Sequence, residues 1–317
     1  MASDPTRRRK PSRMAVLLSL LEAMRPRQWI KNLLVIAGVF YARKLSDGSS
    51  VLRAVAAFVL FCAISGVIYI VNDVLDLEQD RHHPKKRLRP VASGRLPVPV
   101  AWAAAGVIGV AALVLSFVVS VPLGFCALAY ALMMSAYSLR LKQVVILDIL
   151  ILSIGFVLRA YAGCLAAVVE ATPWFLACVL FLALFISICK RRHELLLLNE
   201  RATDHRVVLR DYSPAFLDQM VSVSTAASLL SYTLWTVSTQ TQAQIHPEFR
   251  GMIITVPFVV YGIFRYLFLV YHRSEGGAPE VMFLTDRSLL INTILWLSVV
   301  MILIYYHRLL EWLPIAG

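Results

Sequence analysis

The chain has 317 residues, 59% of them apolar and only 16% charged, and its mean hydropathy is +0.72. A soluble domain of this length needs far fewer apolar residues, so the composition excludes that class and places most of the chain in lipid. The net charge of +12 does not indicate nucleic-acid binding, because the basic residues of a membrane protein collect in its cytoplasmic loops.

The N-terminal segment 1–27 is basic and is predicted to lie in the cytoplasm. Within it, residues 14–24 form a short apolar run that Glu22 interrupts, which is typical of an amphipathic helix at the membrane interface. No small-residue cleavage site follows, so a removable signal peptide is not expected. The basic residues before this run are Arg7, Arg8, Arg9, Lys10 and Arg13.

Nine stretches are apolar enough to cross a bilayer, whose hydrocarbon core of about 30 Å needs roughly 20 helical residues. We therefore predict an all-α fold, a polytopic transmembrane bundle of nine helices. It would form a single catalytic membrane domain, 28–308, followed by an extracytoplasmic tail, 309–317. The predicted spans are 28–44, 52–74, 99–119, 122–139, 144–166, 173–189, 216–239, 251–272 and 287–308.

The basic residues fall mostly on one side of this arrangement. If the N-terminus is cytoplasmic, the inside segments hold most of the lysines and arginines. Positive residues favour the cytoplasmic side, so we predict a multi-pass protein of the cell membrane with its N-terminus and its long polar loops inside. The outside segments hold only Arg43, Lys44, Arg53, Arg250 and Arg308.

An acidic cluster follows the second predicted span. Asn72, Asp76 and Asp80 recur every four residues, and Asp73 precedes Asp76 by three, so a helix places them on one face. Carboxylate and amide oxygens suit Mg²⁺, which bridges a few carboxylates to substrate phosphates. We predict that these four residues bind Mg²⁺ and that the three aspartates are catalytic. The alternative is a helix end that is merely solvated among the lipid headgroups.

The same loop then turns basic at Lys85, Arg87 and Arg89. Acidic residues followed at once by basic ones suit a metal-diphosphate site, because the metal neutralises bridging oxygens while Lys and Arg hold terminal ones. Taken alone, the basic run could equally anchor the loop to lipid headgroups.

Further candidates for substrate binding lie near the ends of the fourth and fifth spans. Tyr137 and Lys142 end one span, and Asp148 lies about one turn inside the next. A carboxylate at membrane depth near a lysine is a functional candidate, although a structural Asp148–Lys142 pair explains it as well. Arg159 lies on almost the same helix face, roughly 16 Å deeper at 1.5 Å per residue, which is awkward for a cytoplasmic phosphate site.

The sixth span ends in three cations followed by His193 and Glu194. Lys190 and Arg191 could hold phosphate, or they could form helix-end ion pairs with Glu194 at the spacings of four and three residues. Lys31 and Asn32, in the first predicted span, are polar groups that could face the same pocket. No P-loop, GxGxxG or HExxH pattern occurs in the sequence.

The run Asn72 to Asp80, which reads NDxxDxxxD, together with nine predicted helices and polar cytoplasmic loops, resembles the UbiA superfamily of intramembrane prenyltransferases. The resemblance covers nearly the whole chain. Members usually have two aspartate-rich motifs that bind the diphosphate of a prenyl donor through Mg²⁺. Here the second motif is absent, and Lys190 to Glu194 stands in its expected place.

Three further runs resemble the decaprenyl-phosphate phosphoribosyltransferase branch of that superfamily: His83 to Gly94, Tyr137 to Asp148 and Phe156 to Gly163. The resemblance implies Mg²⁺-dependent transfer of phosphoribose from phosphoribosyl pyrophosphate to a polyprenyl phosphate, with release of pyrophosphate. In that branch the product serves as a cell-wall precursor for arabinan biosynthesis. A donor that carries a 5-phosphate needs additional cations, which agrees with the basic replacement of the second motif. A homo-oligomer is compatible with the sequence.

Two other functions remain open at this level. An ordinary UbiA-type prenyltransferase, acting on a prenyl diphosphate and an aromatic or quinone-precursor acceptor, would fit the NDxxDxxxD motif equally well. A transporter of an anionic solute would also use charged residues at membrane depth. Against transport, inverted repeats and paired broken helices are not evident, and the polar residues crowd one face.

Overall fold

The computed structural model describes residues 12–198, 207–238, 251–272 and 279–312, and these residues form helices with no β-strand among them. The basic run at 7–10 and most of the predicted tail at 309–317 lie outside the described residues. The chain forms two compact units, described here one at a time. Unit 1 contains residues 1–33 and 56–132, and unit 2 contains residues 34–55 and 133–317.

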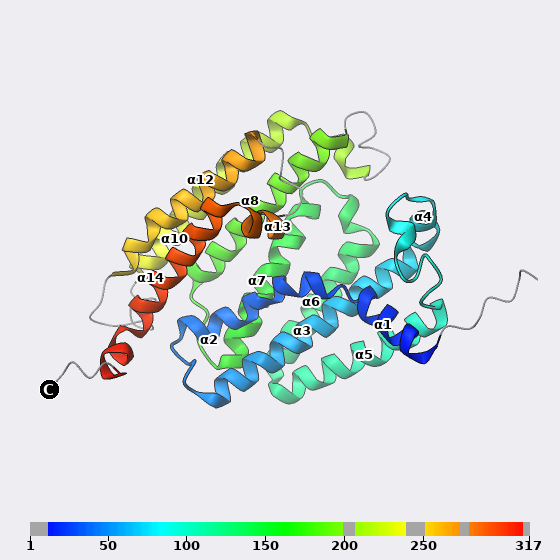
Figure 1. Cartoon of the computed structure of the whole chain (residues 1–317), viewed down its shortest axis with the longest axis horizontal. Helices are drawn as coiled ribbons and strands as arrows, with labels where there is room; N and C mark the ends of the chain where they lie inside the picture. The colour runs from blue at the N-terminus through cyan, green and yellow to red at the C-terminus, as the bar shows by residue number, and fades with distance from the viewer. Residues whose placement is uncertain (1–11, 199–206, 239–250, 273–278, 313–317) are drawn as a thin grey trace, which may run out of the picture. The chain divides into compact units, whose positions relative to one another are not determined.

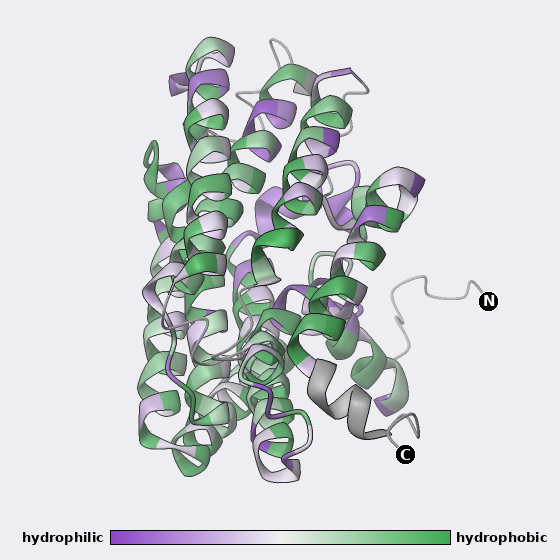
Figure 2. Ribbon diagram, turned by 90° about the vertical axis from the view of Figure 1, so that its left-hand side faces the viewer, coloured by the Kyte–Doolittle hydropathy of each residue, from purple (hydrophilic) through white to green (hydrophobic). Residues whose placement is uncertain are grey.

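Eight helices in the described part are long and apolar enough to cross a membrane, which confirms the all-α membrane fold. Figure 2 shows hydrophobic residues along most of the length of these helices. Each of the eight overlaps one of the predicted spans from the second to the ninth. They are α3 (Gly48–Leu75), α5 (Val98–Val119), α6 (Val121–Leu139), α7 (Leu147–Ala167), α8 (Pro173–Leu198), α10 (Pro214–Val237), α12 (Val256–His272) and α14 (Arg287–Trp312).

The first predicted span, 28–44, has a different structure. A 3₁₀ helix, η1 (Pro26–Ile36), is followed by a single short α-helix, α2 (Ala37–Tyr41). Polar side chains at Gln28, Lys31 and Asn32 interrupt the apolar run, which leaves too little of it for a continuous span of the usual length. The predicted count of nine spans is therefore approximate.

In unit 1, the N-terminal helix packs on the end of α3 and the start of α5. Helix α1 (Arg13–Ala23) begins at Ser12, whose side chain accepts a hydrogen bond from the Ala15 N–H. Its inner face joins a buried cluster that includes Ala23, Ile70 and Leu96. Its other face exposes apolar side chains at helical spacing, and its position at the membrane interface stays a prediction. These side chains are Met14, Leu17, Leu18 and Leu21.

In unit 2, α8, α10, α12 and α14 run side by side (Figure 1). A buried cluster fills the space among α7, α8, α10 and α12, and its large side chains include Phe185, Tyr266 and Leu269. The 3₁₀ helix η5 (Val207–Asp211) contributes Val208 to the same cluster. The short helix α13 (Pro279–Thr285) precedes α14. This packing fixes the ends of α7 and α8, where several predicted site residues lie.

The first turn of α2 lies unusually close to the end of α7. A Cβ atom added to Gly163 would stand 1.9 Å from the carbonyl oxygen of Val35, and one added to Gly38 would stand 2.8 Å from the Cys164 nitrogen. Only glycine allows two backbones to approach this closely, a common device where helices pack in membranes. Lys44 strengthens the junction by donating to the carbonyl oxygens of Ala167 and Val168, both at 3.1 Å.

We predict that Gly163→Ala destabilises the protein strongly, because the new methyl group has backbone rather than a flexible side chain in its way. The matched control is Gly106→Ala in α5, where a Cβ meets nothing within 4 Å. Alanine gains up to about 1 kcal/mol of helix propensity at either position, so the control isolates the steric effect. Thermal unfolding of the purified variants measures it. Equal unfolding temperatures for the two variants would contradict the close packing.

Candidate active site

The acidic motif spans the junction between α3 and the short helix α4 (Leu77–His82). Asp76 separates the two helices, yet its N–H donates to the Asn72 carbonyl at 2.9 Å and its own carbonyl accepts from the Asp80 N–H at 2.8 Å. Helical hydrogen bonding therefore continues through the break. Asp73 and Asp80, seven residues apart, lie two turns apart on one face, and both are buried.

Arg89 joins these two aspartates. Its Nη1 lies 2.6 Å from Oδ2 of Asp80 and 3.2 Å from Oδ1 of Asp73. Lys86 stands 3.9 Å from the other oxygen of Asp80. Two carboxylates that are almost fully buried need such counter-charges, because an unpaired buried charge is very costly. Of the four predicted metal ligands, the structure brings Asp73 and Asp80 together and does so around an arginine.

Arg25 is a second cation at this site, and it was not among the residues predicted to bind substrate. Its Nη2 lies 2.5 Å from Oδ1 of Asp73, and its guanidinium lies 4.5 Å above the ring centre of Tyr69. Its backbone has a φ of 54°, in the left-handed region, directly before Pro26. The one signal in the sequence is an arginine in the polar run just before the first predicted span. The contact of Arg25 with Asp73, 48 residues later in the chain, could not be predicted from the sequence.

The aspartates fit a divalent metal in one specific respect. Oδ2 of Asp73 is buried and, in the described part of the chain, has no hydrogen-bond partner. An approaching cation would satisfy it, and hard oxygen ligands suit Mg²⁺. No three Asp, Glu, His or Cys side chains in the described ranges gather closely enough to hold a metal alone. The residues therefore fit a metal that a phosphate-bearing substrate helps to ligate, the usual arrangement for Mg²⁺.

The other predicted residues of unit 1 differ in exposure. Asn72 and Asp76 are half-buried, and Lys85 and Arg87 are exposed on the basic loop. Lys31 is half-buried in η1. Asn32 is fully buried, and its amide donates to the Cys62 Sγ and the Ser65 Oγ on α3, both at 3.2 Å. Asn32 therefore fixes η1 against α3.

In unit 2, Asp148 lies at the centre of a buried polar network at the start of α7. Its Oδ2 accepts from Nε of Arg191 at 2.6 Å, and its Oδ1 accepts from the hydroxyl of Tyr212 at 2.7 Å. Nη1 of Arg191 also binds Oε2 of Glu194 at 2.5 Å. Asp148 and Arg191 are almost completely buried, so both are held by protein groups. This network brings together three predicted residues, Asp148, Arg191 and Glu194.

The remaining predicted site residues of unit 2 are Tyr137, Lys142, Lys190 and Arg159, and they differ in how they relate to this network. Tyr137 is buried at the end of α6 and forms a hydrogen bond with Arg191. Lys142 and Lys190 are half-buried. Arg159 is buried further along α7, where its Nη1 donates to the Gly155 carbonyl at 3.0 Å and its guanidinium packs over Phe156. These two contacts lie within its own helix.

A second group of the same composition adjoins the first, and sequence reasoning missed it. Nε of Arg192 lies 2.5 Å from Oδ1 of Asp218, and the Tyr271 hydroxyl donates to the same oxygen at 2.7 Å. Arg192 also lies 3.9 Å above the Tyr271 ring centre. Tyr212 and Asp218 carry no local motif, and their partners come from distant helices, so the sequence offered no pattern from which to predict these contacts.

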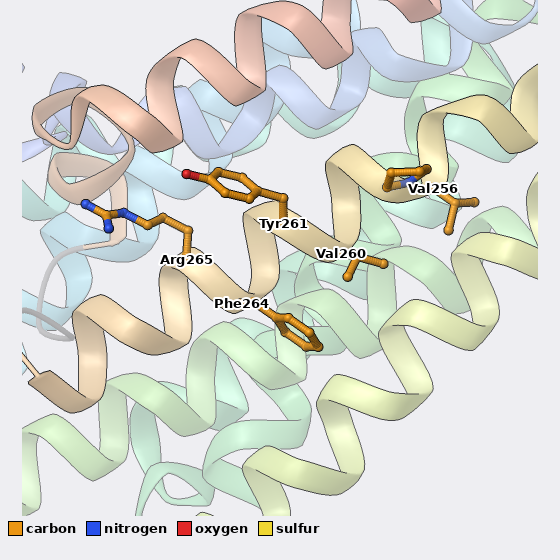
Figure 3. A pocket seen from close by; sticks show the side chains of 6 residues that line it. Val256, Val260, Tyr261, Phe264 and Arg265 are labelled. Carbon is orange, nitrogen blue, oxygen red and sulfur yellow. The ribbon is translucent and has the colours of Figure 1, made fainter.

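Two hollows lie along α12. One, of about 570 Å³, is formed by Val256, Pro257, Val260, Tyr261, Phe264 and Arg265, most of which are labelled in Figure 3. The other, of about 690 Å³, lies between α10 and α12 and shares Phe264. None of the predicted site residues lines either hollow. The candidate site residues therefore lie in the polar clusters and not along these apolar surfaces.

The fold agrees with comparisons with known proteins. The model of the UbiA prenyltransferase family matches residues 32–294. The chain belongs to the UbiA prenyltransferase family and is an integral, multi-pass membrane transferase.

Two bacterial relatives resemble the chain over nearly their whole length. The decaprenyl-phosphate phosphoribosyltransferase of Corynebacterium glutamicum is 34% identical over 95% of this chain and 91% of its own. The protein of the same name from Mycolicibacterium smegmatis is 35% identical over 90% of this chain and 92% of its own. The resemblance to this branch predicted from the sequence is thereby confirmed.

Solved structures confirm the fold. A UbiA homologue from Archaeoglobus fulgidus, bound to GPP and Mg²⁺, superposes with a TM-score of 0.68 over 90% of this chain and 99% of its own. The two sequences are 17% identical, so this likeness concerns the fold alone.

We predict that Arg89→Ala lowers the free energy of unfolding by about 3 kcal/mol or more, because it leaves two buried carboxylates short of a counter-charge. The matched control is Arg95→Ala in the same unit. Arg95 pairs with Glu22 at 2.6 Å, but both side chains are about half exposed, and such pairs contribute at most about 1 kcal/mol. Thermal unfolding in detergent compares the two. A larger loss for Arg95→Ala would contradict the central role of Arg89.

Proposed function

We propose that this chain transfers 5-phosphoribose from phosphoribosyl pyrophosphate to a polyprenyl phosphate and releases pyrophosphate. The observation that carries the proposal is the name shared by the full-length relatives at 33–35% identity, decaprenyl-phosphate phosphoribosyltransferase. The basic residues Lys190 to Arg192 support it, since a donor with a 5-phosphate and a pyrophosphate carries more negative charge than a prenyl diphosphate. By analogy with that branch, the product would be a precursor of cell-wall arabinan.

In this proposal Asp73, Asp76 and Asp80, with Asn72, hold Mg²⁺ together with the donor pyrophosphate. The unpaired Oδ2 of Asp73 supports this assignment, because it is the buried oxygen that a cation would satisfy. When bound, the metal would neutralise charge on the departing pyrophosphate. Structural neighbours solved with Mg²⁺ and GPP or DMAPP make a divalent cation the natural choice.

The basic residues of both units would hold phosphate oxygens. Lys85 and Arg87 are exposed and can reach a ligand. Among the described contacts Arg89 uses only Nη1 for its aspartates, and a guanidinium has five donors, so it can hold a carboxylate and a phosphate at once. Lys190 would serve the same purpose in unit 2, and Arg191, which already pairs with Asp148 and Glu194, would contribute its positive charge rather than a direct contact.

The reaction would break the bond from C1 of the ribose to the pyrophosphate oxygen and form one from C1 to an oxygen of the lipid phosphate. The acceptor phosphate is already ionised at neutral pH, so the chain needs no strong general base. We assign Tyr137, Lys142 and Asp148 to the ribose or the acceptor phosphate, Asp148 acting through its partners because it is buried. Lys31 and Asn32 stay weaker candidates for substrate contact, as does Arg159.

The proposed reaction predicts that purified protein, given Mg²⁺, labelled phosphoribosyl pyrophosphate and a polyprenyl phosphate, forms a labelled lipid extractable into organic solvent. Asp76→Asn should lose most of this activity, because it removes a ligand charge while keeping the size of the side chain. Chelation of Mg²⁺ should have the same effect. The matched control is Asp47→Asn, an exposed aspartate that caps the first turn of α3 through Ser49 and Ser50.

The same assay decides between donors. Label that enters lipid from a prenyl diphosphate and an aromatic acceptor, but never from phosphoribosyl pyrophosphate, would contradict the proposal and favour an ordinary UbiA prenyltransferase. Full activity of Asp76→Asn would remove that residue from the metal site while leaving the reaction itself intact.

We also propose that the N-terminus and the loop after α4 face the cytoplasm, from the distribution of basic residues. In a variant without its native cysteines, a cysteine at exposed Ser46 should react with a membrane-impermeant maleimide added to intact cells. A cysteine at exposed Ser93 should react only after the cells are opened. The reverse pattern of labelling would invert the orientation.

A further inference from the structure

The hydroxyl group of Tyr212 links two groups at the start of α7. It accepts a hydrogen bond from the Ile146 N–H at 2.7 Å and donates one to Oδ1 of Asp148 at 2.7 Å. Tyr212 itself is buried and stacks on Phe216. Burial raises the pKa of its phenol above the usual range, so the hydroxyl keeps the proton that it donates.

The backbone that Tyr212 holds is strained. Ile146 has a φ of 70° and a ψ of −45°, a conformation that β-branched residues rarely adopt. Strain of this kind persists only where the surrounding contacts enforce it, and it is concentrated at functional sites. The Tyr212 hydroxyl is the hydrogen-bond acceptor for this residue's N–H. The geometry of the first turn of α7 therefore depends on Tyr212.

A series of polar contacts connects Tyr212 to Glu194 through the buried side chains of Asp148 and Arg191. Asp148 binds Arg191 at 2.6 Å, and Arg191 binds Glu194 at 2.5 Å. The side chains of Asp148 and Arg191 are 0% and 3% exposed, whereas that of Glu194 is 27% exposed. Of the three charged groups in this chain of contacts, Glu194 is the one that a ligand can reach.

The chemistry of a carboxylate limits what Glu194 can bind. An ionised carboxylate only accepts hydrogen bonds, and it repels phosphate. In phosphoribosyl pyrophosphate the ribose hydroxyls are the hydrogen-bond donors, and every other polar group is an acceptor. We propose that Glu194 binds the ribose hydroxyls of the sugar donor and that Tyr212 is the positioning residue that holds Glu194 in place through Asp148 and Arg191. This inference rests on the proposed function.

The neighbouring group of Tyr271, Asp218 and Arg192 supplies a matched control. It has the same three residue types, and its tyrosine donates to its aspartate at the same 2.7 Å. Tyr271→Phe therefore removes a hydroxyl of equal kind from the same unit, without touching Asp148 or Glu194.

The test compares two ligands in the presence of Mg²⁺ and without acceptor lipid, by calorimetry on the full-length protein in detergent. One ligand is phosphoribosyl pyrophosphate, and the other is inorganic pyrophosphate, which lacks the ribose and its 5-phosphate; Glu194→Gln separates the two, because removing a carboxylate charge would not weaken binding of a phosphate. Tyr212→Phe and Glu194→Gln should weaken binding of phosphoribosyl pyrophosphate about tenfold, the usual scale for losing a hydrogen bond to a charged group. Both variants should bind pyrophosphate as the parent does, and Tyr271→Phe should bind both ligands unchanged.

Three results from the variants would overturn the inference: equal weakening of both ligands in Tyr212→Phe, no weakening of either, or the same losses in Tyr271→Phe. The first and third would indicate a purely structural role. Failure of the proposed function is distinguishable, because a parent protein that binds phosphoribosyl pyrophosphate but never labels lipid contradicts the reaction and leaves the ribose comparison valid. A parent protein that binds the two ligands equally well overturns ribose recognition directly.

Discussion

The pairing of buried carboxylates with arginine at helix ends is the interaction on which both polar clusters depend. Asp73, Asp80 and Asp148 are each almost fully buried in a membrane protein, where an unpaired charge would destabilise the fold severely. Each lies within 3.2 Å of an arginine nitrogen. Arginine suits this task because its planar group has five donors and can hold several oxygens at once. These arginines therefore stabilise the fold whether or not a substrate is bound.

The two clusters differ in how completely their carboxylates are satisfied. In unit 1, Asp73 keeps one buried oxygen without a partner among the described residues, although Arg25 and Arg89 both bind the other. In unit 2, both oxygens of Asp148 are bound, by Arg191 and Tyr212. An unsatisfied oxygen favours binding of an added cation, whereas a satisfied network favours rigidity. This difference supports the proposed metal at the first cluster and the proposed positioning role of the second.

Most of the fold could be predicted from the sequence, because long apolar runs determine membrane helices almost alone. The exception is η1 with α2, where polar side chains interrupt the apolar run; the close contact of Gly163 with Val35, which joins this segment to α7, is not revealed by any local pattern. The acidic motif was identified from its helical spacing, and Asp73 with Asp80 does lie on one face. Their arginine partners could not be foreseen, because Arg25 and Arg89 lie 48 and 16 residues from Asp73 along the chain. Tyr212, which directly follows the 3₁₀ helix η5 and carries no motif, could not be foreseen for the same reason.

The three consecutive cations at the end of α8 look equivalent in sequence but have different roles in the structure. Successive helical residues point about 100° apart, so neighbouring side chains meet different surroundings. Arg191 binds Asp148 and Glu194. Arg192 binds Asp218 and packs over the ring of Tyr271. Lys190 is half-buried and forms no ion pair within the described residues. A basic run can therefore replace an aspartate motif without supplying three equivalent phosphate ligands, because Arg191 and Arg192 already pair with carboxylates and Lys190 is the member proposed to bind substrate.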